Sequence, residues 1–306
     1  MYRLICLFCL FISTVKANAQ KEVAFTIDDV PNTSLFYNEG FKSRLLEEID
    51  SMQLPVAIFI NEQLIYSTDS IAKNLNLLNS WIKTKEVTVG NHAFSHAMYS
   101  AVGLDSFKTE VLKGEAISRE LANRYHKPLI YFRFPYNDLG MNARQHKEAA
   151  VFLRSKNYVI TPFTIQCEDW MITELYEFYK SHHRMADAAR TGRAFIQKTV
   201  AYFEYIESLT SQKVGRDVKQ IYLMHDNLLE ADWLPAIIRA LKAKEYSFIS
   251  LDDAMQDPVY SQKVYYQQKP GISWVYRWME NEEQRNEIMH NGPKVLDFES
   301  ELKNLK

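Results

Sequence analysis

The stretch Val23-Ala24-Phe25-Thr26-Ile27-Asp28-Asp29-Val30-Pro31 decides the fold expected for this chain of 306 residues. Its first five residues are small, aromatic or β-branched, which is typical of a buried strand. The two carboxylates therefore follow the end of a strand, where α/β folds carry their active sites. Adjacent buried acids repel one another unless a cation or a proton intervenes. Taken alone, the pair is more often a helix N-cap or an Asx turn before Pro31, so its meaning depends on the residues downstream.

Strand-like and helical patterns alternate after this stretch. Apolar runs of strand length predict strands at residues 23–27, 55–61, 86–90, 129–134, 158–165, 220–224 and 248–251. Helical spacing of apolar residues predicts helices at residues 40–52, 69–83, 105–125, 143–155, 187–209 and 232–244. This alternation is typical of an α/β fold with a parallel sheet of about seven strands, and closure into a barrel is the expected way to end it.

The chain is expected to have three parts. Residues 1–19 combine a basic start, an apolar run over residues 4–12 and small residues before position 20, which is the pattern of a secretory signal peptide. The apolar run is too short to span a bilayer as a permanent helix. Residues 20–256 carry the alternating pattern, and residues 257–306 form a C-terminal extension that we expect to pack on the barrel. Cleavage of the signal peptide predicts export, either to the periplasm or out of the cell.

Composition limits the possible partners. The chain has 36 basic and 38 acidic residues and a formal net charge of −2, so no basic surface suggests nucleic acid. Of three cysteines, only Cys167 lies outside the predicted signal peptide, which excludes an intrachain disulfide in the mature protein. No nucleic acid and no permanent membrane span are expected, and the sequence leaves the oligomeric state open.

A pair of histidines follows the predicted strand at residues 86–90, in Asn91-His92-Ala93-Phe94-Ser95-His96. Histidines at positions i and i+4 of a helical turn share one face and reach one divalent ion. Such a pair alone is more often surface or core histidine. Combined with a carboxylate at a strand end, it offers two nitrogens and one oxygen and leaves positions open for water and substrate, as in catalytic zinc sites.

Three further polar groups lie at the ends of predicted strands or shortly after them. Arg133 could pair with a surface acid, or it could hold a catalytic carboxylate in its ionised form. His225 follows an apolar run and is suited to acid–base chemistry if a carboxylate tunes it, and Asp169 is the candidate. Each of these residues, taken singly, is more often structural.

Together, five motifs in this order resemble those of the polysaccharide deacetylase family, also called the NodB-homology or carbohydrate esterase family 4 domain. They are Thr26-Ile27-Asp28-Asp29, His92-x-x-Ser95-His96, Arg133-x-Pro135-Tyr136, Asp169-Trp170 and Leu223-x-His225. The resemblance covers about residues 22–255. It implies a distorted parallel (β/α) barrel that hydrolyses acetyl groups from N-acetylated sugars, or from acetylated xylan, with one divalent metal ion. That ion is usually Zn²⁺, although Co²⁺, Ni²⁺ or Mn²⁺ serve some members.

Carried over residue by residue, the resemblance implies that Asp29, His92 and His96 bind the metal. Asp28 would be the general base that takes a proton from the attacking water, and Arg133 would hold its carboxylate in place. Successive side chains at a strand end point in different directions, so adjacent acids can divide the tasks of ligand and base.

The resemblance also implies roles on the leaving-group side. His225 would be the general acid that protonates the leaving sugar amine, with Asp169 setting its charge. The backbone N–H of Tyr136 would help to stabilise the oxyanion, and Trp170 would form part of the apolar wall beside the acetyl methyl group.

Three positions depart from the family pattern. Val30 and Asn137 stand where glycines are common, and Gln166 replaces a common Asp. Asn tolerates the left-handed backbone conformation better than most residues, so we expect the oxyanion loop to survive. The departures leave every predicted ligand, base and acid in place and predict an unusual substrate preference.

Three functions fit these residues. The first is a secreted, metal-dependent deacetylase of N-acetylated glycans of the peptidoglycan or chitin type. The second keeps the barrel and metal but cleaves an acetylxylan-type ester or another non-peptide amide. The third is a non-catalytic glycan-binding protein, against which the intact Asp28 and His225 argue, because a binding module needs neither a base nor an acid.

Overall fold

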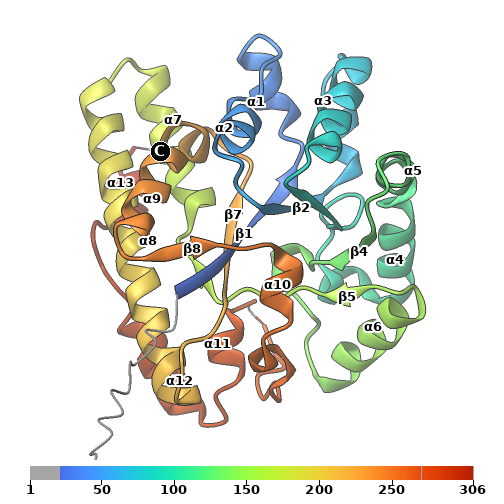
Figure 1. Ribbon diagram of the computed structural model, residues 1–306, viewed down its shortest axis with the longest axis vertical. Coiled ribbons are helices and arrows are strands. Elements are labelled where there is room, and N and C mark those ends of the chain that lie inside the picture. Colours follow the sequence, from blue (N-terminus) through green and yellow to red (C-terminus); the bar gives the residue numbers. More distant parts are fainter. Residues whose placement is uncertain (1–20, 270, 306) are drawn as a thin grey trace, which may run out of the picture.

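A curled parallel sheet forms the centre of the molecule, and helices surround it (Figure 1). The computed structural model describes residues 21–269 and 271–305, so the predicted signal peptide lies outside the described residues. The strands run in the order β5-β4-β3-β2-β1-β7-β6, with β8 also paired to β1, and every pairing is parallel. Their bounds are β1 (Lys21–Val30), β2 (Val56–Ile60), β3 (Val87–Asn91), β4 (Leu129–Phe132), β5 (Val159–Ile160), β6 (Ile165–Gln166), β7 (Gln220–His225) and β8 (Tyr246–Phe248). The α/β class and the distorted parallel barrel expected from the sequence are confirmed.

The barrel is distorted where one strand was predicted and two short strands occur. The prediction of a single strand at residues 158–165 was wrong, because β5 ends before Pro162 and β6 begins after it. Proline has no N–H to donate to a strand ladder. The residues between β5 and β6 instead form hydrogen bonds with the two neighbouring strands. Thr161 N donates to the carbonyl of Phe132 in β4, and Thr164 N donates to that of Ile221 in β7. The backbone thereby crosses from β4 to β7 without regular pairing.

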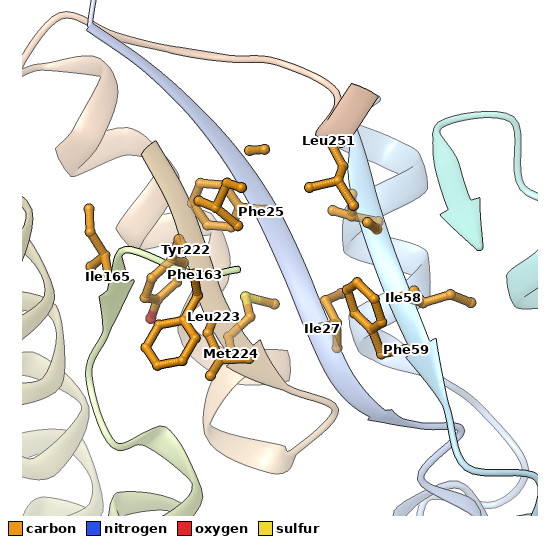
Figure 2. Close-up of a cluster of buried hydrophobic side chains, with 14 of the residues drawn as sticks. Phe25, Ile27, Ile58, Phe59, Phe163, Ile165, Tyr222, Leu223, Met224 and Leu251 are labelled. Carbon is orange, nitrogen blue, oxygen red and sulfur yellow. The ribbon is translucent and has the colours of Figure 1, made fainter. Parts of the chain in front are cut away.

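Strand β1 lies in the middle of the sheet and is buried on both faces. Figure 2 shows Phe25 and Ile27 between side chains of β7 and of β2. The Phe25 ring lies 5.2 Å from that of Tyr222 and 6.5 Å from that of Phe203 on the helix α8 (Met185–Val214), measured between centroids. Thr26, one residue along, instead receives a hydrogen bond from Arg133. The alternation of a strand therefore sends one set of side chains to the helices and the other to Arg133.

Most predicted helices are present; the helix at residues 143–155 has the predicted bounds, and the others have changed ends. The first helices are α1 (Thr33–Asn38), α2 (Arg44–Met52), α3 (Ile71–Lys83), α4 (Tyr99–Lys113), α5 (Ala116–Arg124) and α6 (Ala143–Ser155). The single helix predicted at residues 105–125 was wrong, because the chain breaks at Gly114 into α4 and α5. A Cβ at Gly114 would lie 2.5 Å from the carbonyl carbon of Ala93, so the glycine permits a close approach of two backbones.

The remaining helices are α7 (Asp169–Ser181), α8, α9 (Leu228–Lys242), α10 (Leu251–Met255), α11 (Trp274–Arg277), α12 (Glu282–His290) and α13 (Phe298–Lys303). The sequence did not predict α7, and the last strand ends at Phe248 rather than at Leu251, which begins α10. Helix α13 packs on α7 (Figure 1). Over the described ranges, no helix has both the length and the apolar character to cross a bilayer.

Candidate active site and metal centre

The predicted site residues converge where parallel strands end at one edge of the sheet. In the register of β1 and β7, Asp28 is paired with His225, so the first and last motifs lie side by side. A pocket of about 600 Å³ opens at this edge, and its lining includes Asp29, His96, Trp170 and His225. The topology thus brings together groups that are far apart in the sequence.

Asp28 is a buried carboxylate held by Arg133, which is completely buried. The Nη1 atom of Arg133 donates to Oδ1 of Asp28 over 3.0 Å and to Oγ1 of Thr26 over 2.7 Å. Its Nη2 atom donates to the carbonyl of Pro162 over 3.0 Å. Burial raises the pKa of Asp28, and the charge of Arg133 opposes that rise. The carboxylate is therefore fixed in place, with Oδ2 lying 3.6 Å from Nε2 of His92.

Asp29, His92 and His96 bring one oxygen and two nitrogens within 4.8 Å of one another. Oδ1 of Asp29 lies 3.4 Å from Nε2 of His96 and 3.7 Å from Nε2 of His92. The other ring nitrogen of His92, Nδ1, lies 2.8 Å from the carbonyl oxygen of Arg133, which can only accept. That contact assigns the proton to Nδ1 and leaves the Nε2 lone pair facing the cluster.

This donor set fits a divalent cation of the zinc type. Burial, followed by the neighbouring His96, lowers the pKa of His92 to about 3, so the ring is neutral and can act as a ligand. Two imidazole nitrogens with one carboxylate oxygen form the three-ligand arrangement of catalytic zinc sites. Asp29 is partly exposed, with a side-chain exposure of 40%, so the cluster is accessible from solvent.

The two histidines do not lie on a helical turn, and that part of the prediction was wrong. The segment is irregular, and Ala93 and His96 take left-handed conformations with φ of 63° and 58°. It is held from several sides: the Asn61 amide donates to the carbonyl of Ala93 over 3.2 Å, and the Glu110 carboxylate accepts two hydrogen bonds from the serine before His96. Contacts far along the chain therefore bring the rings together.

His225 is paired with Asp169. Its Nδ1 atom lies 2.9 Å from Oδ1 of Asp169, and its backbone N–H donates to Oδ2 over 2.7 Å. The Asn227 amide donates to the same Oδ2 over 2.9 Å. Burial is the largest single influence and disfavours the charged ring, but the charge and hydrogen bond of Asp169, together with the charges of Asp29 and Asp28, outweigh it and raise the pKa of His225 to about 10. The imidazole is therefore a cation at neutral pH, and its Nε2 side is left for a partner in the pocket.

Tyr136 and Trp170 lie beside these groups. The Tyr136 ring packs against His96, with centroids 4.4 Å apart, and both Tyr136 and Asn137 have left-handed backbones with φ of 56° and 50°. The left-handed conformation expected of Asn137 is thus present. Trp170 is 53% exposed at the start of α7, and it lines both the 600 Å³ pocket and an adjacent pocket of about 850 Å³ formed with the C-terminal residues.

Sequence reasoning gave Asp226 no role. This carboxylate is buried, contributes to the pocket wall, and accepts the backbone N–H of Asn32 over 2.8 Å. Burial raises the pKa of Asp226 to about 7, and Asp29 adds to the rise. Its place directly after His225 at the end of a strand was the available signal.

Residues 16–152 match the model of a family described as polysaccharide deacetylase. A peptidoglycan-N-acetylglucosamine deacetylase of Bacillus cereus is 25% identical over 149 residues, which make up 49% of this chain and 46% of that protein. The match therefore spans about half the length of this curated relative.

Two solved structures share the fold. A CE4 family pseudoenzyme from Bacillus anthracis is 16% identical, with a TM-score of 0.51 over 78% of this chain and 66% of its own. A family 4 carbohydrate esterase of Bacillus subtilis is also 16% identical, with a TM-score of 0.50 over 78% of this chain and 82% of its own. At such identities the likeness shows the fold alone, and since one of the two is a pseudoenzyme, the case for catalysis depends on this chain's own site residues.

Proposed function

We propose that this chain belongs to the polysaccharide deacetylase family and is a metal-dependent hydrolase that removes acetyl groups from N-acetylated glycans. One observation supports this above all others: Asp28 and His225, each with its own charged partner, stand on neighbouring strands beside the cluster of Asp29, His92 and His96. A binding protein has no need of a buried base and a charged acid at adjacent strand ends.

Amide hydrolysis explains why these groups occur together. An amide carbonyl is a poor electrophile, and an amine leaves badly as an anion. A divalent cation bound by Asp29, His92 and His96 would supply Lewis-acid chemistry, polarising the acetyl carbonyl and easing the ionisation of water. The protein must add a base for the attacking water and an acid for the leaving nitrogen.

Asp28 is proposed as the base. Its carboxylate lies within 3.6 Å of the His92 ring, at the edge of the metal-ligand cluster. Arg133 fixes its orientation through Oδ1, which leaves Oδ2 for the proton of the attacking water. Burial brings its pKa upward from that of a free carboxyl, towards the range in which a base both exists ionised and accepts a proton readily.

His225 is proposed as the acid that protonates the leaving amine. Asp169 holds Nδ1 and keeps the ring cationic, so that Nε2 carries a proton to donate. The main-chain N–H of Tyr136 is proposed to stabilise the oxyanion, and Trp170, which lines the pocket beside His225, is proposed as a wall for the acetyl group.

The substrate class and location are also proposals. The Bacillus cereus relative is described as a deacetylase of N-acetylglucosamine in peptidoglycan, which supports a peptidoglycan- or chitin-type substrate. The pattern of residues 1–19 supports export, where such polymers occur. Zn²⁺ is the proposed metal, from the two imidazoles and one carboxylate of the cluster.

Acetate release tests the function. Purified protein loaded with Zn²⁺ is incubated with N-acetylglucosamine oligomers, peptidoglycan and acetylxylan, before and after chelation. Asp28→Asn is compared with Asp105→Asn, a matched change at a side chain that is 96% exposed. We expect release from N-acetylated substrates that disappears with the chelator and with Asp28→Asn but persists in Asp105→Asn.

Each other outcome counts against the proposal in a distinct way. Release from acetylxylan alone would identify an esterase. Binding of oligomers without release, despite one bound metal ion per chain, would identify a glycan-binding protein. Release that survives the loss of Asp28 would refute its role as the base.

A further inference from the structure

The loop that carries Tyr136 has a backbone conformation that is unfavourable for residues other than glycine. Tyr136 and Asn137 are consecutive residues with φ of 56° and 50°, and neither is glycine. A side chain in the left-handed region crowds its own backbone, so such residues persist only where surrounding contacts determine them. Inside the loop, Asn137 N donates to the carbonyl of Phe134 and Asp138 N to that of Pro135. These two hydrogen bonds use the N–H groups of Asn137 and Asp138. The carbonyls of Tyr136 and Asn137 therefore need partners or contacts from other parts of the chain.

Arg277, in the C-terminal residues, reaches this loop. It is completely buried, and its Nη2 atom donates to the carbonyl of Asn137 over 2.9 Å. Its Nε atom donates to the carbonyl of Ile272 over 2.9 Å, and the guanidinium lies over the Trp274 ring, 4.9 Å from the centroid. The side chain is therefore a fixed link between the C-terminal segment and the loop.

Gly271 packs closely against the backbone of the same loop. A Cβ added at this position would lie 2.1 Å from the carbonyl oxygen of Tyr136, a distance at which the loop must move. The segment itself is tied to the barrel, because Trp274 N donates to the carbonyl of Phe163 over 3.0 Å and Ser273 Oγ donates to that of Thr164 over 2.7 Å. Residues 271–277 thus connect the barrel to the Tyr136 loop through hydrogen bonds at both ends.

We propose that Arg277 is a positioning residue that holds Tyr136 and Asn137 in the left-handed conformation and so aims the Tyr136 N–H at the reacting acetyl group. A glycine at position 137 would adopt this conformation without support, whereas Asn137 is held in it by Arg277. The catalytic consequence rests on the proposed deacetylase function, whereas the effect on the loop does not.

The kinetic test compares three variants. Arg277→Met removes the hydrogen bonds at similar volume, and Arg277→Lys keeps the charge but cannot make both bonds. Arg285→Met is the matched control: Arg285 is also buried in the C-terminal segment, lies over the Tyr266 ring at 4.9 Å and donates to the carbonyl of Met279. We expect Arg277→Met to lower kcat roughly tenfold or more, below the full loss of an oxyanion donor, with KM little changed.

Repeating the comparison in the variant Asn137→Gly distinguishes loss of loop positioning from general destabilisation of the fold. In Asn137→Gly the left-handed conformation at position 137, whose carbonyl Arg277 holds, no longer carries a steric cost, while Tyr136 is unchanged. We therefore expect Arg277→Met to lower kcat much less in Asn137→Gly than in wild type, and Arg285→Met to leave kcat near wild type in both. An equal loss of kcat in both backgrounds, or an equal loss in Arg285→Met, would overturn the proposal.

A measurement without substrate keeps the two proposals distinct. Hydrogen exchange at the amides of residues 136–138 should be faster in Arg277→Met than in wild type or Arg285→Met. If the wild type releases no acetate but this difference is seen, the proposed function fails and the positioning role stands. If acetate is released and exchange is unchanged in Arg277→Met, the positioning role fails.

Discussion

Replacing Asp169 by asparagine should move the alkaline limb of the activity profile down by about 3.5 pH units. Asp169 is the main group that raises the pKa of His225 to about 10 from its ordinary 6.5, against burial, which lowers it. A general acid works in its protonated form, so activity falls as pH rises through this pKa. At pH 8 the protonated share of His225 should fall from nearly all to roughly 3%, about a thirtyfold loss of kcat/KM, if the pKa returns to its ordinary value.

The loss should be pH-dependent, which distinguishes it from damage to the site. Near pH 5.5, where the ring is protonated in both proteins, Asp169→Asn should approach wild-type activity to within the cost of one weakened hydrogen bond. The assay is acetate release from an N-acetylglucosamine oligomer between pH 5 and pH 10, with metal content measured on the same samples. Equal loss at every pH, or an alkaline limb that does not move while the metal is retained, would refute the reasoning.

Three further predictions concern the same pocket. Asp28→Asn should lower kcat by roughly 10²–10⁴ with the fold retained, as judged by circular dichroism, because it removes the base; activity within tenfold of wild type would contradict this. His92→Ala should abolish stoichiometric Zn²⁺ binding measured by atomic emission, and wild-type activity lost to a chelator should return on adding Zn²⁺; full metal content in the variant would exclude His92 as a ligand. Asp226→Asn should stabilise the protein at pH 8 by roughly 1–3 kcal/mol in urea unfolding and by little at pH 4, because a buried acid with a raised pKa weakens the fold as pH rises towards that pKa of about 7; equal effects at both pH values would refute this.

Much of the fold could be predicted because its strands are short, apolar and well separated. Residues 56–60 and 129–132 are strands within the predicted bounds, since runs of this length and composition have few alternatives. Two of the failed predictions have different reasons. Pro162, a local signal, interrupts the run at residues 158–165, whereas α7, which begins at the motif residue Asp169, has no local pattern that predicted it. A local pattern records propensity but not which neighbour a segment will meet.

The sequence by itself determined the kinds of groups in the site and their place at strand ends, because parallel strands all end at one edge of the sheet. Only the tertiary structure decided how they meet. The register of β1 and β7 sets Asp28 beside His225, and Asn61 and Glu110 hold the histidine loop, which is not a helix. Arg277 reaches Asn137 across 140 residues of sequence, a contact that no local pattern encodes. Strand ends follow from neighbouring residues, whereas ligand geometry and loop conformation follow from contacts between distant ones.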